Sequence, residues 1–236
     1  MIDVKDFIQI EKVNEEFEGI IESFGKIYPD KLCCIGGGAV RDFLLGRMPK
    51  DIDVFFMGAD WTTDAREDFE KRLQATGLSY RVDIGALPWH KYERYLLLSI
   101  LWNKQQSNEG GDLSIQFMGF PWNNITDLLR TFDWEICLFG YQRGGRIITT
   151  QRALDLIEGI KKYSFADPLS NAKYIPPKMR LCNVQFPISN LRRGFKFEAR
   201  YPIKLEYESV LKLCSEVLRE DADCRIRNAR EKKEAK

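Results

Sequence analysis

One short stretch of the chain, residues 34–56, carries most of the information about its structure: Cys34-Ile-Gly-Gly-Gly-Ala-Val-Arg-Asp-Phe-Leu-Leu-Gly-Arg-Met-Pro-Lys-Asp-Ile-Asp-Val-Phe-Phe56. The apolar run at 32–35 predicts a buried strand, and the glycines that follow it predict a turn. Residues 39–45 predict a short helix, and residues 52–56 predict a second buried strand. The stretch therefore predicts a strand, a glycine turn, a helix and a strand in direct succession.

Two carboxylates, Asp51 and Asp53, stand at the beginning of the second strand. Successive side chains of a strand point to opposite faces, so this spacing places both carboxylates on one face. Paired carboxylates on a rigid strand suit divalent cations, which prefer oxygen ligands. The amides of Gly37 and Gly38 lie at a predicted helix N-terminus, where they are expected to be bare and to favour a phosphate. Together these features predict phosphoryl chemistry on a nucleotide.

Four short motifs occur in order in this stretch. A glycine pair and an Arg-Asp pair lie in Gly37-Gly38-Ala39-Val40-Arg41-Asp42, and they are followed by Leu44-Leu45-Gly46 and by the D-x-D motif Asp51-Ile52-Asp53. The combination resembles the head domain of the DNA polymerase beta nucleotidyltransferase superfamily. It is most similar to the variant in class II CCA-adding enzymes and bacterial poly(A) polymerases. The alternative is a strand, turn and helix with a surface acidic pair, which any one motif alone would equally allow.

Later segments resemble the second half of nucleotidyltransferase-like proteins of large phages. They are Thr131-Phe-Asp-Trp-Glu-Ile-Cys-Leu-Phe-Gly-Tyr141, Ile147-Ile-Thr-Thr-Gln-Arg-Ala-Leu154 and Arg193-Gly194-Phe195. The combined similarity covers residues 30 to 200, with specific motifs early and looser ones late. It implies an α/β (α+β) fold with a mixed sheet, flanking helices and a mainly helical, basic C-terminal extension.

The resemblance also implies roles for individual residues. Asp51 and Asp53 would hold two Mg²⁺ (or Mn²⁺) ions. The amides of Gly37 and Gly38 would bind the triphosphate, with Arg41 nearby. Asp42 would orient Arg41 or a nucleotide hydroxyl.

Active members of this superfamily usually add a third carboxylate from a neighbouring strand. The expected strand is 113–118, where the side chain at the corresponding position is Gln116, a neutral amide. A replacement is predicted on the strand 132–137, where Asp133 and Glu135 share a face. We expect Asp133, rather than Glu135, to complete the site as a third catalytic carboxylate.

Bulk properties describe an ordinary globular chain of 236 residues with a formal net charge of +1. No apolar run reaches the length of a membrane span and no signal peptide is recognisable, so a cytoplasmic protein without a membrane partner is expected. A single histidine, His90, and six cysteines without a C-x-x-C pair argue against a zinc site and a hydrolase triad. Cys33, Cys34 and Cys137 lie in apolar runs and are expected in the core.

The expected organisation is a nucleotidyltransferase head at 1–150, a helical basic extension at 151–218 and a charged tail at 219–236. Apolar residues recur at helical spacing between positions 4 and 27 and predict one amphipathic N-terminal helix. Residues 103–111 predict a hairpin loop. Asn123 or Asn124 is expected to cap a short helix.

Residues 171–204 are rich in cations with interleaved aromatics, and Glu198 is the single acid among them. This composition suits a nucleic-acid backbone and its bases, and Arg192, Arg193 and Lys196 are the predicted contacts. The alternative is a polar surface whose aromatic residues belong to the core.

The leading functional hypothesis is a metal-dependent nucleotidyltransferase that moves an NMP from an NTP to an acceptor, with an RNA 3′-end as one candidate. Ordinary CCA addition is not expected, because the helical domains that follow the head in those enzymes are largely absent. One alternative is a catalytically silent module that binds a nucleotide or a partner, which Gln116 favours. Another is an enzyme that nucleotidylates a protein. The base, the acceptor and the oligomeric state are left open.

Overall fold

The chain forms two compact units in a computed structural model that describes residues 2–58, 63–82, 96–102, 113–121, 123–164, 175–184 and 186–234. Unit 1 contains Met1–Phe132 and Ile136–Ile157, and unit 2 contains Asp133–Glu135 and Glu158–Lys236. The second passage of the chain from unit 1 to unit 2 lies at 157/158. Helix α7 (Tyr207–Glu234) runs through position 219. The expected division into a head at 1–150, an extension at 151–218 and a tail at 219–236 stays a prediction. His90 and the predicted loop at 103–111 lie outside the described residues.

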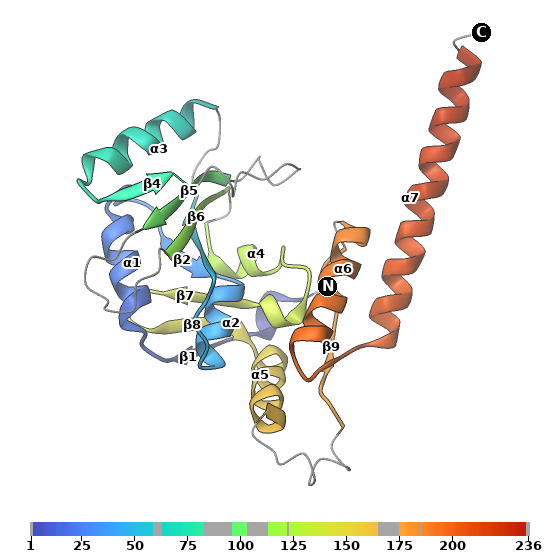
Figure 1. The fold of residues 1–236 in the computed structure, drawn as a ribbon, viewed down its shortest axis with the longest axis horizontal. Helices are drawn as coiled ribbons and strands as arrows, with labels where there is room; N and C mark the ends of the chain where they lie inside the picture. The colour runs from blue at the N-terminus through green and yellow to red at the C-terminus, as the bar shows by residue number, and fades with distance from the viewer. Residues whose placement is uncertain are drawn as a thin grey trace. The chain divides into compact units, whose positions relative to one another are not determined.

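Unit 1 is built on a mixed sheet that has eight strands within the described ranges, in the order β1-β8-β7-β2-β3-β6-β5-β4 (Figure 1). β3 and β6 pair in parallel, and the other neighbouring strands of this sheet pair antiparallel. The predicted mixed sheet with flanking helices is confirmed. The strand bounds are β1 Phe7–Glu11, β2 Cys33–Gly36, β3 Asp51–Met57, β4 Tyr80–Val82, β5 Leu96–Trp102, β6 Leu113–Phe120, β7 Phe139–Gln142 and β8 Arg146–Thr150.

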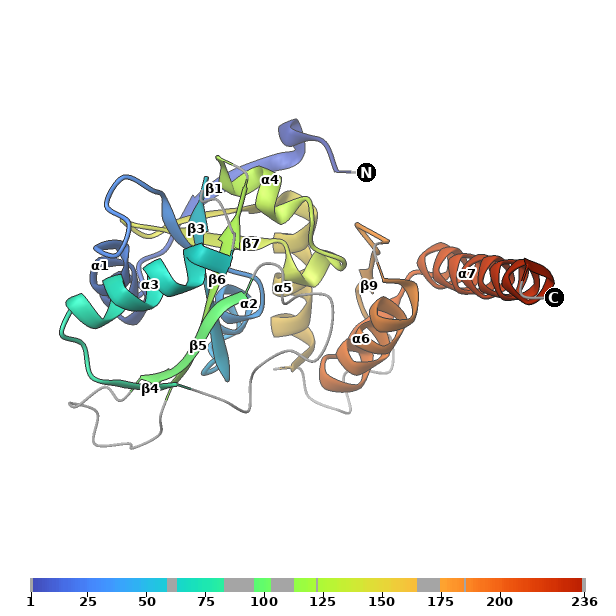
Figure 2. The ribbon, with the colours of Figure 1, turned by 90° about the horizontal axis from the view of Figure 1, so that it is seen from above.

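Helices cover both faces of this sheet: α1 Glu15–Gly25, α2 Gly38–Leu44, α3 Thr63–Ala75, α4 Ile125–Leu129 and α5 Gln151–Ser164, the last of which continues into unit 2. In Figure 2, α1 and α3 lie on one side of β3 and β6, and α4 lies on the other. Phe24 of α1 and Phe69 of α3 both pack on Phe117 of β6, with ring centroids 4.9 and 5.0 Å away. These aromatic contacts pack α1 and α3 against this face of the sheet.

The three cysteines expected in the core are all buried. Burial in apolar surroundings raises the pKa of the Cys33 thiol to about 12 and also raises the pKa of Cys34. A thiol that stays protonated is a poor nucleophile, so these two cysteines act as packing residues.

The N-terminal segment departs from the prediction of one long helix. Residues 7–11 form β1, which pairs with β8 along its whole length from Phe7↔Thr150 to Glu11↔Arg146. Helix α1 begins only after Asn14, whose side-chain oxygen accepts the amides of Glu16 and Phe17 at 2.9 and 3.1 Å. The prediction of a helix is wrong for the residues before this cap and right for those after it. The residues before it form a strand because they pair with β8, which is remote in sequence.

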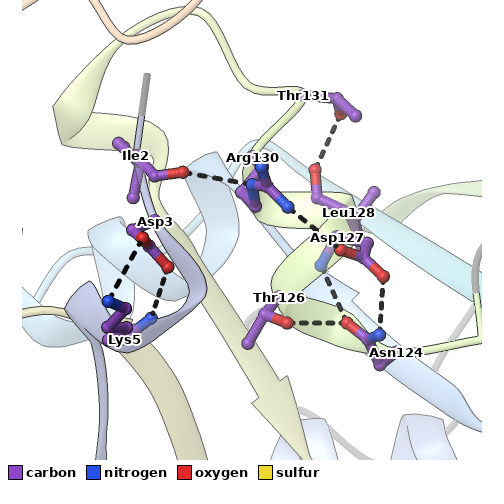
Figure 3. Close-up of polar contacts among 9 residues, drawn as sticks. All are labelled: Ile2, Asp3, Lys5, Asn124, Thr126, Asp127, Leu128, Arg130 and Thr131. Atoms are coloured by element: carbon purple, nitrogen blue, oxygen red, sulfur yellow. Dashed lines mark hydrogen bonds and ion pairs between the residues drawn. The ribbon is translucent and has the colours of Figure 1, made fainter.

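A short helix, α4, is fixed at both of its ends (Figure 3). The side-chain oxygen of Asn124 accepts the Asp127 amide at 2.9 Å, so Asn124 is the cap that the sequence left open between two asparagines. Arg130, just after the helix, donates through Nε to the Ile2 carbonyl at 3.1 Å and pairs with Asp127. α4 is thereby held over β7, where a side chain at Gly140 would clash with Ile125.

Unit 2 is mainly helical, as predicted for the C-terminal extension. It contains α6 (Pro187–Arg200), α7 and a parallel pair of short strands, β9 (Lys178–Met179) and β10 (Lys204–Leu205). The segment 133–135 belongs to this unit, although unit 1 residues flank it on both sides. None of the helices in the described ranges has the length and apolar character that a membrane span requires.

A carboxylate from α1 anchors the β7–β8 hairpin. Glu18 Oε1 accepts the Tyr141 hydroxyl at 2.6 Å and the amides of Gly144 and Gly145 at 2.8 and 2.9 Å. Burial works to raise the pKa of Glu18, but these hydrogen bonds and the charge of Arg143 outweigh it and lower the pKa below the usual value. The ionised carboxylate therefore stabilises the fold.

Replacing Glu18 with Gln should lower Tm at pH 7 by roughly 3 °C, since hydrogen bonds to a charged acceptor contribute on the order of 1 kcal/mol or more. Because the folded-state pKa of Glu18 is lowered, its contribution is present above the unfolded-state pKa and is lost as pH falls through the folded-state value. The Tm difference between wild type and Glu18→Gln should thus shrink as pH is lowered from 7 to 3. Glu15→Gln, an exposed change in the same helical turn, is the control, and an equal pH response in both variants would contradict the anchor.

Candidate functional site

The two carboxylates of the D-x-D motif begin β3. Asp51 is exposed, Ile52 is fully buried and Asp53 is partly buried, which is the alternation expected when both carboxylates share one face. Asp51 is paired in register with Ser114 of β6, and Asp53 with Gln116. The structure therefore brings both predicted carboxylates to one edge of the sheet and supports the placement of Gln116 beside Asp53.

A polar row crosses the sheet at Asp53. It runs from Gly36 of β2 through Asp53 and Gln116 to Ser99 of β5. Ser99 is buried, and within the described residues its hydroxyl has no hydrogen-bond partner. Ser99 and Ser114 were not among the residues predicted for the site. Each is a polar residue inside an apolar strand run, and this interruption could have pointed to it.

The glycine turn lies against Asp53. Gly37 has φ 72° and ψ −130°, a conformation open in practice only to glycine. A Cβ built at Gly37 would lie 3.9 Å from Asp53 Oδ2 and 3.6 Å from the Phe132 ring. The turn, the aspartate and the ring are thus immediate neighbours.

One detail of this turn corrects the sequence analysis. The Gly37 amide is not bare, since it donates to the Phe139 carbonyl of β7 at 2.7 Å. Gly38 is the first residue of α2, a position whose amide a helix leaves without an intrahelical acceptor. Of the two predicted amides, Gly38 is the one with the geometry to meet a ligand.

Arg41 and Asp42 form a buried pair behind the turn. Arg41 Nε donates to Asp42 Oδ1 at 2.9 Å, and the two side chains are only 6% and 4% exposed. A Cβ built at Gly38 would lie 3.2 Å from Arg41 Nη2. Asp42 therefore orients Arg41, as one of its two predicted roles required, and the guanidinium supports the turn from within.

The donor set fits a divalent cation that takes part of its coordination from elsewhere. Among the described residues, no group of three or more Asp, Glu, His or Cys side chains is arranged to hold a metal. Magnesium in phosphoryl-transfer sites is commonly bound by one or two carboxylates together with substrate phosphates and water. Asp51 and Asp53, with the neutral oxygens of Ser114 and Gln116 in register, suit that kind of site.

Asp133, the expected third carboxylate, does not lie on a strand. Residues 135–137 form a 3-10 helix, and the predicted strand begins only at Phe139. Trp134 interrupts the strand because its indole nitrogen donates to the Asn190 carbonyl at 2.8 Å and its backbone bridges Leu181. The shared strand face of Asp133 and Glu135 was therefore a wrong premise, and a metal role for Asp133 stays a prediction.

Within unit 2, Asp133 has a local partner. Its Oδ2 lies 3.0 Å from Arg193 Nη1, and its Oδ1 accepts the Trp134 amide at 3.0 Å. Burial raises the pKa of the Asp133 carboxyl above its usual value, and the charge of Arg193 lowers it only in part. Arg193, predicted to contact nucleic acid, is thus engaged with Asp133, while Arg192 and Lys196 are exposed on α6.

Comparisons with known proteins identify a family and a fold for this chain. The model of the Gabija anti-defense 2 family matches residues 9–158, more than half of the chain. The chain belongs to the Gabija anti-defense 2 family. No curated protein matches this family member.

Solved CCA-adding enzymes share its fold. The Thermotoga maritima CCA-adding enzyme complexed with tRNA is 17% identical with a TM-score of 0.58, over 90% of this chain and 46% of that one. A CCA-adding enzyme in complex with ATP is 16% identical with a TM-score of 0.59, over 92% of this chain and 48% of that one. The chain thus spans just under half of those structures, and at such identity the likeness establishes the nucleotidyltransferase fold and not the reaction.

The turn geometry yields a stability test. Gly37→Ala should cost about 1–3 kcal/mol, because the built Cβ has room and the cost is the strained backbone conformation alone. Gly19→Ala, inside α1 with nothing within 4 Å of the added Cβ, should instead gain about 0.5–1 kcal/mol. Urea unfolding of both variants checks the pair. Equal effects would show that the turn is not restricted to glycine.

The buried Asp133 predicts a second pH response, of opposite sign to that of Glu18. Its folded-state pKa is raised, so its contribution is most favourable below the unfolded-state pKa and declines as pH rises through the folded-state value. Asp133→Asn should therefore gain stability relative to wild type between pH 3 and pH 7, measured by urea midpoints. Arg193→Gln should lose stability over the same range, since it leaves the ionised carboxylate unpaired. Asp133→Asn with a pH-independent difference would refute this account.

Proposed function

We propose that this Gabija anti-defense 2 family member is a metal-dependent nucleotidyltransferase that moves an NMP from an NTP to an acceptor hydroxyl. The observation that carries the proposal is the placement of Asp51 and Asp53 on one face of β3, with Asp53 against the Gly37 turn. Carboxylates beside a helix-opening glycine turn juxtapose a cation site and a phosphate site, which is what this reaction needs.

In the proposed reaction, the acceptor oxygen attacks the α-phosphorus of the NTP. A new P–O bond forms, the bond between the α-phosphorus and the bridging oxygen breaks, pyrophosphate leaves with the electron pair, and the hydroxyl proton is released to water. Bound Mg²⁺ or Mn²⁺ would neutralise phosphate charge and activate the hydroxyl. Asp51 and Asp53 are proposed to hold the cation, Gly37 and Gly38 to shape the triphosphate turn, and Arg41 with Asp42 to keep that turn in place.

The family description suggests where such a transfer would be used. We infer that the modified acceptor belongs to, or is sensed by, the Gabija defense that the family name says these proteins oppose. The acceptor is either a nucleic-acid 3′-hydroxyl or a hydroxyl on a protein. Both use the same attack on the α-phosphorus, so the head alone does not distinguish them.

A second candidate function rests on Gln116. Because Gln116 occupies the register position beside Asp53, the site has less negative charge than a three-carboxylate site would have. A module with weaker cation binding would hold a nucleotide without turning it over, and would act by binding a partner. Nucleotide binding without turnover is the result that would favour this candidate.

The deciding experiment incubates the protein with each of four α-labelled NTPs, with Mg²⁺ or Mn²⁺, and with RNA or protein acceptors. Transfer of label is expected in wild type, and Asp51→Asn or Asp53→Asn should reduce it by more than about a hundredfold, since cation binding contributes several kcal/mol to such reactions. Both variants should keep or slightly raise Tm, because neighbouring carboxylates repel each other when no cation is bound.

Asp30→Asn, an exposed substitution of the same kind in unit 1, is the matched control and should leave transfer unchanged. Binding of NTP by wild type without label transfer to any acceptor would favour the silent module. Equal transfer by Asp53→Asn and Asp30→Asn would eliminate the D-x-D site.

A further inference from the structure

Helix α6 has one face inside unit 2 and one face in solvent. Its buried residues are Pro187, Asn190, Gly194 and Phe197. A side chain at Gly194 would meet the Trp134 ring, with the nearest ring atom 2.5 Å from the built Cβ, so this face is closely packed. The opposite face exposes two large apolar side chains, Ile188 at 52% and Phe195 at 51%.

The solvent face of α6 is also positively charged. Arg192, Lys196 and Arg200 are exposed on it, at successive intervals of four residues and therefore one above the other along the helix. Glu198 is the single acidic residue of α6, and it pairs with Lys204 at 3.4 Å. Arg193, the remaining cation, is held by Asp133 on the edge toward the core. The local charge is thus strongly positive, although the net charge of the whole chain is only +1.

Phe195 adds an exposed aromatic ring to this positively charged face. It lies one turn after Arg192, on the same side of α6, so an exposed aromatic ring stands next to the row of cations that Arg192 begins. Nucleic-acid bases stack on such rings whatever their sequence, and phosphates on either side of the base meet the cations. An acidic peptide would use the cations but would gain little from a flat exposed ring.

We propose that the outer face of α6, formed by Ile188, Arg192, Phe195, Lys196 and Arg200, binds single-stranded nucleic acid. The surface reads backbone charge and base stacking and not sequence, because it offers a ring and cations rather than a pocket with fixed donors and acceptors.

The test measures fluorescence anisotropy of labelled single-stranded RNA and DNA oligonucleotides, without NTP or divalent cation, over a series of salt concentrations. Wild type should bind both, with affinity falling steeply as salt rises. Arg192→Ala with Lys196→Ala should weaken binding and flatten the log–log salt slope by roughly 1.4, about 0.7 for each lost phosphate contact on a single strand. Phe195→Ala should weaken binding about tenfold without changing the slope, and Phe195→Trp should restore it.

Lys162→Ala with Lys212→Ala is the charge-matched control for the double variant, since it removes two exposed cations from the same unit. The inference is overturned if wild type does not bind either oligonucleotide at low salt, or if the α6 variants bind like this control. It is also overturned if poly-glutamate binds as tightly as the oligonucleotides and Phe195→Ala does not discriminate between them.

The outcome stands apart from that of the proposed function, because binding is measured without substrate or metal. Oligonucleotide binding through α6 with no label transfer to any acceptor would reject the transferase and keep the surface. Label transfer to a protein, with no oligonucleotide binding, would do the opposite.

Discussion

The absence of a side chain at position 37 is the constraint on which the head of this protein depends. A positive φ at Gly37 turns the chain from β2 directly into α2, and the Gly37 amide ties that turn to β7. The ring of Phe132 and the carboxylate of Asp53 lie beside this position, at ordinary contact distance from a Cβ built there. The connection of β2 to α2 and the position of the candidate site therefore both depend on the backbone conformation of Gly37.

Much of unit 1 could be predicted because its signals are local. The succession of strand, glycine turn, helix and D-x-D strand depends on residues that are close in sequence, and its order is confirmed with each end shifted by one residue. Asp51 and Asp53 share a face because strand periodicity alone dictates it. The position of Gln116 was also predictable, since β6 is a mostly apolar strand that carries Gln116 at the register position beside Asp53.

The failures share a physical cause, which is pairing with segments remote in sequence. Residues 7–11 were predicted as helix because their apolar positions fit helical as well as strand periodicity. They form strand β1 because they pair with β8. Asp133 looked like part of a strand until Trp134 found its partners some 50 residues later, at Asn190 and Leu181. The pairing of Arg193 with Asp133, 60 residues earlier, was likewise invisible in the local pattern. Local periodicity cannot report such contacts.

The interleaving of the two units has a consequence for how the chain can be divided. Residues 133–135 leave unit 1 and return to it, so the units are joined by three covalent passages and not by one linker. A fragment that ends at 157 would contain the whole sheet but would strip Trp134, fully buried in the intact chain, of Leu181, Asn190 and Gly194. Unit 1 is thus not encoded by one uninterrupted stretch of the chain. A fusion or recombination event at 157/158 would therefore leave residues 133–135 joined to unit 1 and separated from the rest of unit 2.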